Sequence, residues 1–214
     1  RHLHHTLYGG NLLPALTGST TAYVWESQEK DPLKPANHIK GKEYLFPALI
    51  LALGVAARLY CFCGFYGTDD RYYARLAMAV AENSSRLLEG WEAAPVFKTR
   101  IGIIGPAALA IRLTGPGEWA VIAHSFAASL GGILLAFWAG RYFFGSRAGL
   151  IAAGIQALVP LDARLATMFL PDLPMAFWGN AGFVLLLAGL KKDKAADRIS
   201  LGAGAGMAFG LAWL

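Results

Sequence analysis

Two adjacent acids, Asp69 and Asp70, follow the first long apolar stretch of the sequence, within the run from Gly67 to Ala74. Neighbouring carboxylates repel each other, so they need a helix N-terminus, a cation or a proton close by. One interpretation is helix capping, with Thr68 or Asp69 as the N-cap and Asp70 in the first turn. The other is catalysis, in which one Asp removes the proton of a hydroxyl acceptor. Its neighbour would then hold that geometry, a metal ion or a cationic group of the donor.

A third acid, Asp172, begins another apolar stretch and stands between Pro171 and Leu173-Pro174. It too could cap a helix. The prolines around it interrupt regular helix geometry, which would let its carboxylate point into a cavity shared with the first two acids. Shortly before it, Asp162 and Arg164 are expected to form an ion pair in a loop.

Cations that could hold a phosphate, Lys98 and Arg100, lie between the acidic pair and the third acid along the chain. Lysine and arginine bind phosphate through charge-assisted hydrogen bonds. The alternative is that both are interface anchors that would accept any anionic lipid headgroup. Tyr73, four residues after Asp69, completes the set of candidate substrate-binding residues.

The elements that must position these residues are apolar. Hydrophobic residues make up 56% of the 214 residues and charged residues 15%, whereas a water-soluble domain carries about 25% charged residues. Mean hydropathy is +0.43, which excludes an intrinsically disordered chain and argues against a cytosolic enzyme. The net charge of +5 does not indicate nucleic acid as a partner, because the basic residues lie at the ends of apolar runs. The two cysteines, Cys61 and Cys63, are too few for a disulfide framework.

Five segments are predicted to span a membrane, since about 20 apolar residues cross a hydrocarbon core about 30 Å thick. They are approximately residues 44–65, 119–144, 148–161, 173–190 and 199–214. The predicted fold is therefore an all-α, multi-pass transmembrane helix bundle over 44–214, preceded by a polar tail, 1–43, that is expected to be disordered. Arg58 falls near the end of the first span, where its long side chain is expected to snorkel to the interface.

Basic residues in the short connections predict the orientation of these spans. With five spans, one side collects Lys34, Lys40, Lys42, Arg141, Arg147, Lys191, Lys192, Lys194 and Arg198. That side is predicted to be the cytoplasm. The loops 66–118 and 162–172, and with them all three acids, then face the opposite compartment.

The connections and the last span carry further patterns. Apolar residues at three- and four-residue spacing predict an interfacial helix over 70–88. Residues 101–113 are apolar but too short to span, and are predicted to form a second interfacial or re-entrant piece that breaks at Gly105-Pro106. In the last span, three glycines at four-residue spacing predict a face for close helix contact; they are Gly202, Gly206 and Gly210.

A series of short motifs runs in one order along the chain. The acidic pair lies in an Asp-Asp-x-x-Tyr-Ala setting, and a Leu-x-Gly turn, 113–115, precedes the second span. An aromatic-Phe-Gly turn, 142–145, joins the second and third spans, Pro160 ends the third, and a Leu-Pro-Asp-x-Pro element, 170–174, begins the fourth. This series resembles the membrane glycosyltransferases of the C superfamily, in the branch of protein O-mannosyltransferases and bacterial aminoarabinose and lipopolysaccharide-core transferases. Members of that family are much longer, so we expect this sequence to be an N-terminal fragment that lacks the later spans and the outer domain.

The resemblance implies inverting transfer of a sugar from a polyprenyl-phosphate donor to a lipid, glycan or protein acceptor. It places the reaction at the outer face of a bacterial plasma membrane, among membrane lipids and without nucleic acid. It implies that Asp69 is the catalytic acid/base, that Asp70 takes the place of the second acid, and that Asp172 is the acid of the fourth span. The Glu-Lys-Pro-Pro element of the aminoarabinose branch is replaced by Phe-Lys-Thr-Arg at 97–100, which argues against aminoarabinose as the sugar and leaves the role of a divalent metal open.

Two other classes of function remain from the residues alone. A transporter or channel subunit could use the acidic pair as a cation or proton site, although these acids lie at span ends and the spans carry few ionisable residues. A non-catalytic membrane scaffold would need only the glycine face.

Overall fold

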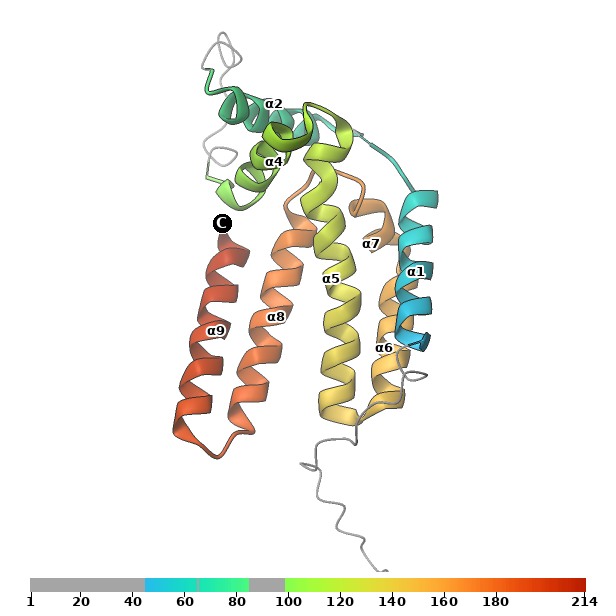
Figure 1. The fold of residues 1–214 in the computed structure, drawn as a ribbon, viewed down its shortest axis with the longest axis vertical. Coiled ribbons are helices and arrows are strands. Elements are labelled where there is room, and N and C mark those ends of the chain that lie inside the picture. Colours follow the sequence, from blue (N-terminus) through green and yellow to red (C-terminus); the bar gives the residue numbers. More distant parts are fainter. Residues whose placement is uncertain (1–44, 65, 85–98) are drawn as a thin grey trace, which may run out of the picture. The chain divides into compact units, whose positions relative to one another are not determined.

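The computed structural model describes residues 45–64, 66–84 and 99–214, all within one compact unit of the chain. Within these ranges the protein is helical and contains no strand. Five helices lie side by side (Figure 1): α1 (Leu45–Tyr60), α5 (Glu118–Phe144), α6 (Ser146–Leu158), α8 (Asp172–Leu190) and α9 (Ala195–Trp213). Their positions match the five segments predicted from hydropathy, and the all-α class is confirmed for the described residues.

Two of these helices, α5 and α8, are long and apolar enough to cross a membrane by length and composition. The helices α1 and α4 (Ile101–Thr114) are apolar but shorter. A bundle in which all five segments span the membrane therefore stays a prediction.

The third predicted span is shorter than expected. α6 ends at Leu158, Val159 is extended with φ −63° and ψ 114°, and Pro160 begins a separate six-residue helix, α7 (Pro160–Leu165). A residue that precedes proline is pushed out of the helical region, and proline itself is accommodated at the first position of a helix. The chain therefore turns at Val159 and carries Asp162 on an element of its own.

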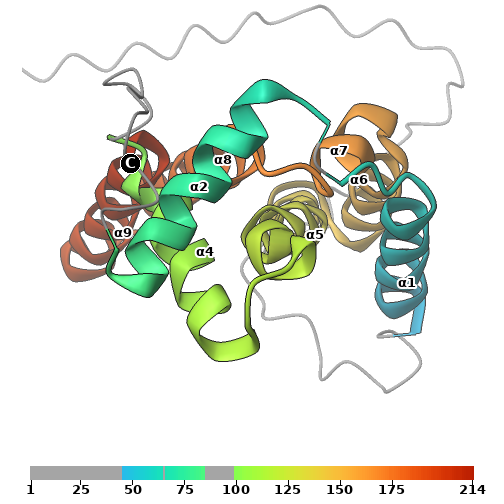
Figure 2. The ribbon, with the colours of Figure 1, turned by 90° about the horizontal axis from the view of Figure 1, so that it is seen from above.

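α2 (Thr68–Glu82) and α4 lie together at one end of the five helices (Figures 1 and 2). They pack on each other and on α5 through a core that includes Tyr73, Ile103, Ile122 and Phe169. The predicted end of α2 at residue 88 was wrong. α2 stops at Glu82 because Asn83 adopts the left-handed conformation, φ 51°, and residues 85–88 of the predicted helix lie outside the described residues.

α4 runs without a break through Pro106, contrary to the predicted interruption at Gly105-Pro106. Proline lacks an N–H, so it removes the single bond that would reach the carbonyl of Gly102 four residues earlier. Because this loss falls near the start of the helix, the other turns stay intact and the apolar face continues to Thr114.

α5 and α6 approach each other closely at two glycines. A Cβ atom on Gly149 would stand 2.6 Å from the carbonyl oxygen of Phe137, and one on Gly140 would stand 2.8 Å from the Cα of Gly149. The prediction for α9 was wrong: Cβ atoms on its three spaced glycines, Gly202, Gly206 and Gly210, would meet no atom within 4 Å in the described part of the chain. α9 instead packs on α8 through its alanines and through Phe209, which fills the space beside Gly182.

The basic turns between α5 and α6 and between α8 and α9 lie at the same end of the helices. The Lys191 ammonium lies 4.6 Å from the ring centroid of Phe143, so the α5–α6 turn and the α8–α9 turn share one end. At the other end, the Gly102 N–H donates a 3.1 Å hydrogen bond to the carbonyl of Leu214. The basic turns predicted to be cytoplasmic thus lie together, away from α2 and α4, and their sidedness in a membrane stays a prediction.

Candidate functional site

Asp70 is fully buried and caps α2. One of its carboxylate oxygens accepts hydrogen bonds from the backbone N–H of Tyr66 at 3.0 Å and of Gly67 at 3.4 Å. Gly67 is the N-cap, so the prediction of Thr68 or Asp69 for that position was wrong, while Asp70 does lie in the first turn. The carboxylate bonds the N–H of the N-cap residue, as the third residue of a capping box does. Its second oxygen, Oδ1, has no hydrogen-bond partner among the described residues.

Asp69 differs from its neighbour because its side chain is exposed, in the first turn of α2. Asp172 is likewise exposed, in the first turn of α8. An exposed carboxylate can meet a substrate, whereas a buried one acts through the backbone that it holds. The structure therefore gives the two members of the acidic pair different surroundings.

Tyr73 connects the first acid to the third. Its phenol is buried against Phe169, with ring centroids 6.1 Å apart in an edge-to-face arrangement. Burial raises the pKa of Tyr73 above its usual value of 10; the Arg100 charge opposes this, and the negative charges of Asp69 and Asp172 add to it. Coulomb interactions weaken with distance, so each of these three charged side chains is close enough to Tyr73 to act on its pKa.

Arg100 stands at the junction of α4 and α8. It is the N-cap residue of α4, and its Nη1 donates to the sulfur of Met175 at 2.9 Å. Met175 lies three residues after Asp172, on the first turns of α8. The guanidinium is thus near the N-terminal end of α8, which begins at Asp172. The other predicted cation, Lys98, lies outside the described residues.

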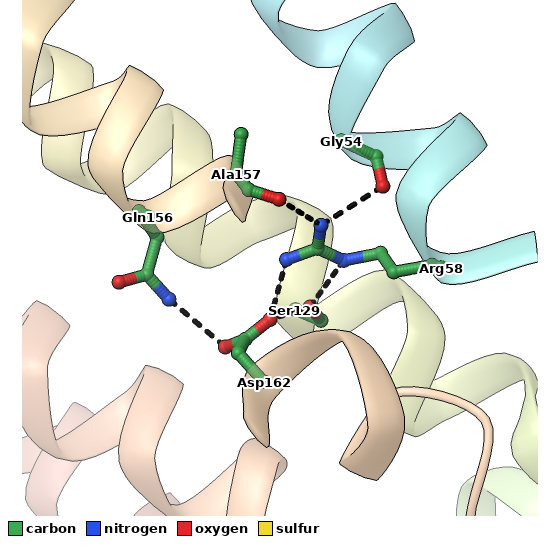
Figure 3. A network of polar contacts seen from close by, with 6 residues as sticks. All are labelled: Gly54, Arg58, Ser129, Gln156, Ala157 and Asp162. Atoms are coloured by element: carbon green, nitrogen blue, oxygen red, sulfur yellow. Dashed lines mark hydrogen bonds and ion pairs between the residues drawn. The ribbon is translucent and has the colours of Figure 1, made fainter. Parts of the chain in front are cut away.

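A second polar cluster, centred on Arg58, lies between the helices (Figure 3). Arg58 has an exposed fraction of 0%, so the prediction that it snorkels to an interface was wrong. Its Nη2 forms an ion pair with Asp162, its Nε donates to Ser129 Oγ at 2.6 Å, and its Nη1 donates to the carbonyls of Gly54 and Ala157 at 2.9 and 3.1 Å.

Both carboxylate oxygens of Asp162, the ion-pair partner of Arg58, accept hydrogen bonds. Oδ1 accepts from Arg58 and from the Ser129 hydroxyl, and Oδ2 accepts from the Gln156 amide at 2.9 Å. The predicted loop pair of Asp162 with Arg164 was therefore wrong. The Arg164 guanidinium instead lies over the Tyr66 ring, 4.8 Å from its centroid.

Two cavities lie among the described helices. One, of about 270 Å³, is formed by α5, α6, α7 and α8, with Ser129, Gln156, Asp162 and Asn180 among apolar residues. The other, of about 450 Å³, lies between α2, α4 and the start of α5 and carries Arg71 and Glu118 at its edge. In the described ranges, no three side chains of the His, Cys, Asp and Glu types gather as a group that could hold a metal ion.

The described residues define a helical protein with two apolar helices long enough to cross a membrane, and its exposed acids Asp69 and Asp172 each lie in the first turn of a helix. Residues 106–212, half of the chain, match the family described as dolichyl-phosphate-mannose-protein mannosyltransferase. The chain belongs to this family, whose members are membrane glycosyltransferases of the C superfamily. The searches of curated proteins and of solved structures gave no match.

The matched region contains α5 to α9, and with them Asp162 and Asp172, but it leaves out Asp69, Asp70, Tyr73 and Arg100. The roles of these four residues consequently rest on their geometry. Sequence reasoning missed the Arg58–Asp162 pair. A basic residue inside an apolar stretch and an acid two residues after Pro160 were the signals that could have found the pair.

Proposed function

We propose that this protein transfers a sugar from a polyprenyl-phosphate donor to a hydroxyl acceptor on the non-cytoplasmic side of a membrane. The name of its family points to mannose as the sugar and to a dolichyl-type lipid as the carrier. The observation that supports the proposal is that Asp69 and Asp172, both exposed, begin α2 and α8, and that Arg100 contacts Met175 near the start of α8. This is the end of the helices away from the basic turns.

Asp69 is the general base in this proposal. It accepts the proton of the acceptor hydroxyl while the hydroxyl oxygen attacks the anomeric carbon of the sugar. The bond between that carbon and the phosphate oxygen breaks, and the lipid phosphate leaves with the electron pair. Attack opposite the leaving group inverts the anomeric configuration. Asp69 suits this task because it is exposed, and a base must reach the proton that it removes.

Arg100 and Lys98 stabilise the charge that develops on the departing phosphate. Arg100 is oriented by Met175, which keeps its guanidinium at the outer end of α8. Asp172 holds hydroxyl groups of the sugar or acceptor on the opposite side of the same spot. Tyr73 is buried beside these side chains, and its neutral phenol forms part of the wall of the substrate site.

Asp70 has a structural role in this proposal and does not touch the substrate. Its carboxylate fixes the turn at Tyr66 and Gly67 from which α2 starts, and so it sets where Asp69 points. Its role as the second acid of the pair is therefore to hold the geometry of the first.

Asp69→Asn tests the proposal, with Asp197→Asn as the matched control. Both acids are exposed and lie in the first turn of a helix, but Asp197 is in α9, next to the basic turn. In membranes supplied with dolichyl-phosphate mannose, we expect Asp69→Asn to lower turnover by a factor of about 100 or more, the usual contribution of a general base. Asp197→Asn should leave turnover unchanged. Equal turnover for wild type and Asp69→Asn would remove Asp69 from the mechanism.

The transporter alternative finds one supporting feature, a buried ionisable pair among apolar helices. In this pair, however, both oxygens of Asp162 already accept hydrogen bonds from Arg58, Ser129 and Gln156. Uptake of labelled cations into vesicles, measured beside consumption of the lipid-linked sugar, separates the two functions. Consumption without uptake is the expected result.

A further inference from the structure

Two short linkers carry the acids of the candidate site. One joins α1 to α2 and leads to Asp69, and the other joins α7 to α8 and leads to Asp172. The two acids lie about 100 residues apart in sequence, so nothing in the local chain sets their separation. Their relative position depends on where the two linkers are held.

The two linkers are joined by hydrogen bonds between backbone groups of one and a side chain of the other. The Cys63 N–H donates to Thr167 Oγ1 at 3.1 Å, and this buried hydroxyl lies 3.5 Å from the carbonyl of Cys61. Closer to the site, the Arg164 guanidinium covers the Tyr66 ring. These contacts therefore hold the linker that leads to Asp69 against the chain that leads to Asp172.

The Arg58–Asp162 pair lies at the base of both linkers. Arg58 is in the last turn of α1, and Asp162 is in the first turn of α7. The guanidinium donates to groups on α1, α5, α6 and α7 at once (Figure 3). Arginine suits this task because its planar group presents five N–H donors in fixed directions, which lysine cannot do.

We infer that Arg58 and Asp162 are positioning residues, which hold the two linkers in the register that brings Asp69 and Asp172 to one site. The inference rests on the proposed function, because it assigns this register a purpose in sugar transfer. A buried ion pair is weak evidence of a stabilising role, since such pairs can often be replaced by apolar residues of similar size without loss of stability. If the pair serves to position the two linkers, apolar replacements should leave the protein folded but should lower the rate of sugar transfer.

The test replaces both partners by apolar residues, in the variant Arg58→Met/Asp162→Leu. The control is Asp197→Leu/Arg198→Met, which changes the same residue types at the basic end. Three quantities are measured: the thermal midpoint in detergent, steady-state transfer from dolichyl-phosphate mannose, and the yield of a cross-link between the linkers. The cross-link joins cysteines at positions 66 and 164 with a short bismaleimide, with Cys61 and Cys63 changed to Ser.

We expect the double variant to keep a thermal midpoint close to that of the wild type. Its cross-link yield should fall, and its kcat should fall 10- to 100-fold with a donor KM that changes less than threefold, because a displacement of about 1 Å can cost about 100-fold in rate. The control should match the wild type in all three quantities. Arg58→Lys, which keeps the charge but not the fork of donors, should fold and show an intermediate kcat.

Unchanged cross-linking and unchanged kcat in the double variant would overturn the inference. So would a loss of activity that follows only the loss of folded protein, since that describes a purely structural pair. If the double variant fails to fold, Arg58→Lys decides in the same way. If the wild type itself transfers no sugar, the proposed function fails, and the cross-link yield still shows whether the pair sets the register.

Discussion

Replacing Asp70 by Ala or by Asn separates a structural role from a chemical one. Ala removes the oxygen that accepts from the N–H groups of Tyr66 and Gly67, whereas Asn keeps an oxygen in that place. Losing an N-terminal capping side chain costs about 0.5–2 kcal/mol, and leaving a buried N–H without a partner costs about 1–3 kcal/mol. These two estimates describe overlapping losses, so we expect Asp70→Ala to lower the free energy of unfolding by about 2 kcal/mol.

For Asn the loss should be within about 1 kcal/mol, because the two hydrogen bonds remain and only their charge assistance is lost. A change of 1 kcal/mol shifts the thermal midpoint of a domain of this size by about 2–4 °C. Circular dichroism in detergent should therefore place the midpoint of the Ala variant about 4–8 °C below that of the wild type, with Asn much closer to it.

The transfer assay then completes this prediction. If Asp70 only holds the start of α2, the Asn variant should keep most of the wild-type kcat and the Ala variant should lose more of it. The reasoning is refuted if the Asn variant is as stable as the wild type and yet inactive, because Asp70 would then take part in the reaction itself. The reasoning is also refuted if the Ala variant has the same thermal midpoint as the wild type.

Two further predictions follow from packing and from charge. Gly149→Leu should lower the free energy of unfolding by about 1–3 kcal/mol, since the new side chain meets the backbone of α5. Gly206→Leu, on the open face of α9, should change the free energy of unfolding by less than about 0.5 kcal/mol. Equal thermal midpoints for the two variants would contradict the close α5–α6 contact. Tyr73 should ionise only above pH 10, because its pKa is raised in the folded protein. Stability due to this group is then complete below pH 10 and is lost as the pH rises through the folded pKa, since the unfolded chain ionises first. A difference titration at 295 nm between wild type and Tyr73→Phe measures the midpoint, and a value at or below 10 would contradict the burial and the nearby acids.

Hydropathy was sufficient to predict where the long helices lie, because an apolar stretch bounded by basic residues has few alternatives to a buried or membrane helix. The five predicted segments and the helices α1, α5, α6, α8 and α9 coincide in this way. Predictions failed where local rules were applied without the tertiary setting. Pro106 was expected to break a helix, yet it lies where the loss of one hydrogen bond is tolerated.

The glycines show a similar limit. Spacing identified a small-residue face on α9 but could not say which helix would meet it, and the close contact belongs to Gly140 and Gly149 on other helices. Spacing describes only one surface of a contact, and the partner surface depends on the whole arrangement.

The candidate site was predictable in part, because its acids mark helix starts. Asp69, Asp70 and Asp172 were all found in this way, and each lies in a first turn. Their different burial was not predictable, since it depends on how α2 rests on α4 and α5. The Arg58–Asp162 pair joins residues 104 positions apart, and no pattern within a single segment of sequence contains such a contact.

Whether Asp69 and Asp172 face the same compartment is tested most directly by labelling single cysteines from outside intact cells. Cysteines are placed at positions 69, 172 and 194 of a protein in which Cys61 and Cys63 are changed to Ser, and a membrane-impermeant maleimide is added. We predict that positions 69 and 172 react before the cells are lysed and that position 194, in the basic turn between α8 and α9, reacts only afterwards. Labelling of positions 69 and 172 from opposite sides of the membrane would contradict a shared site.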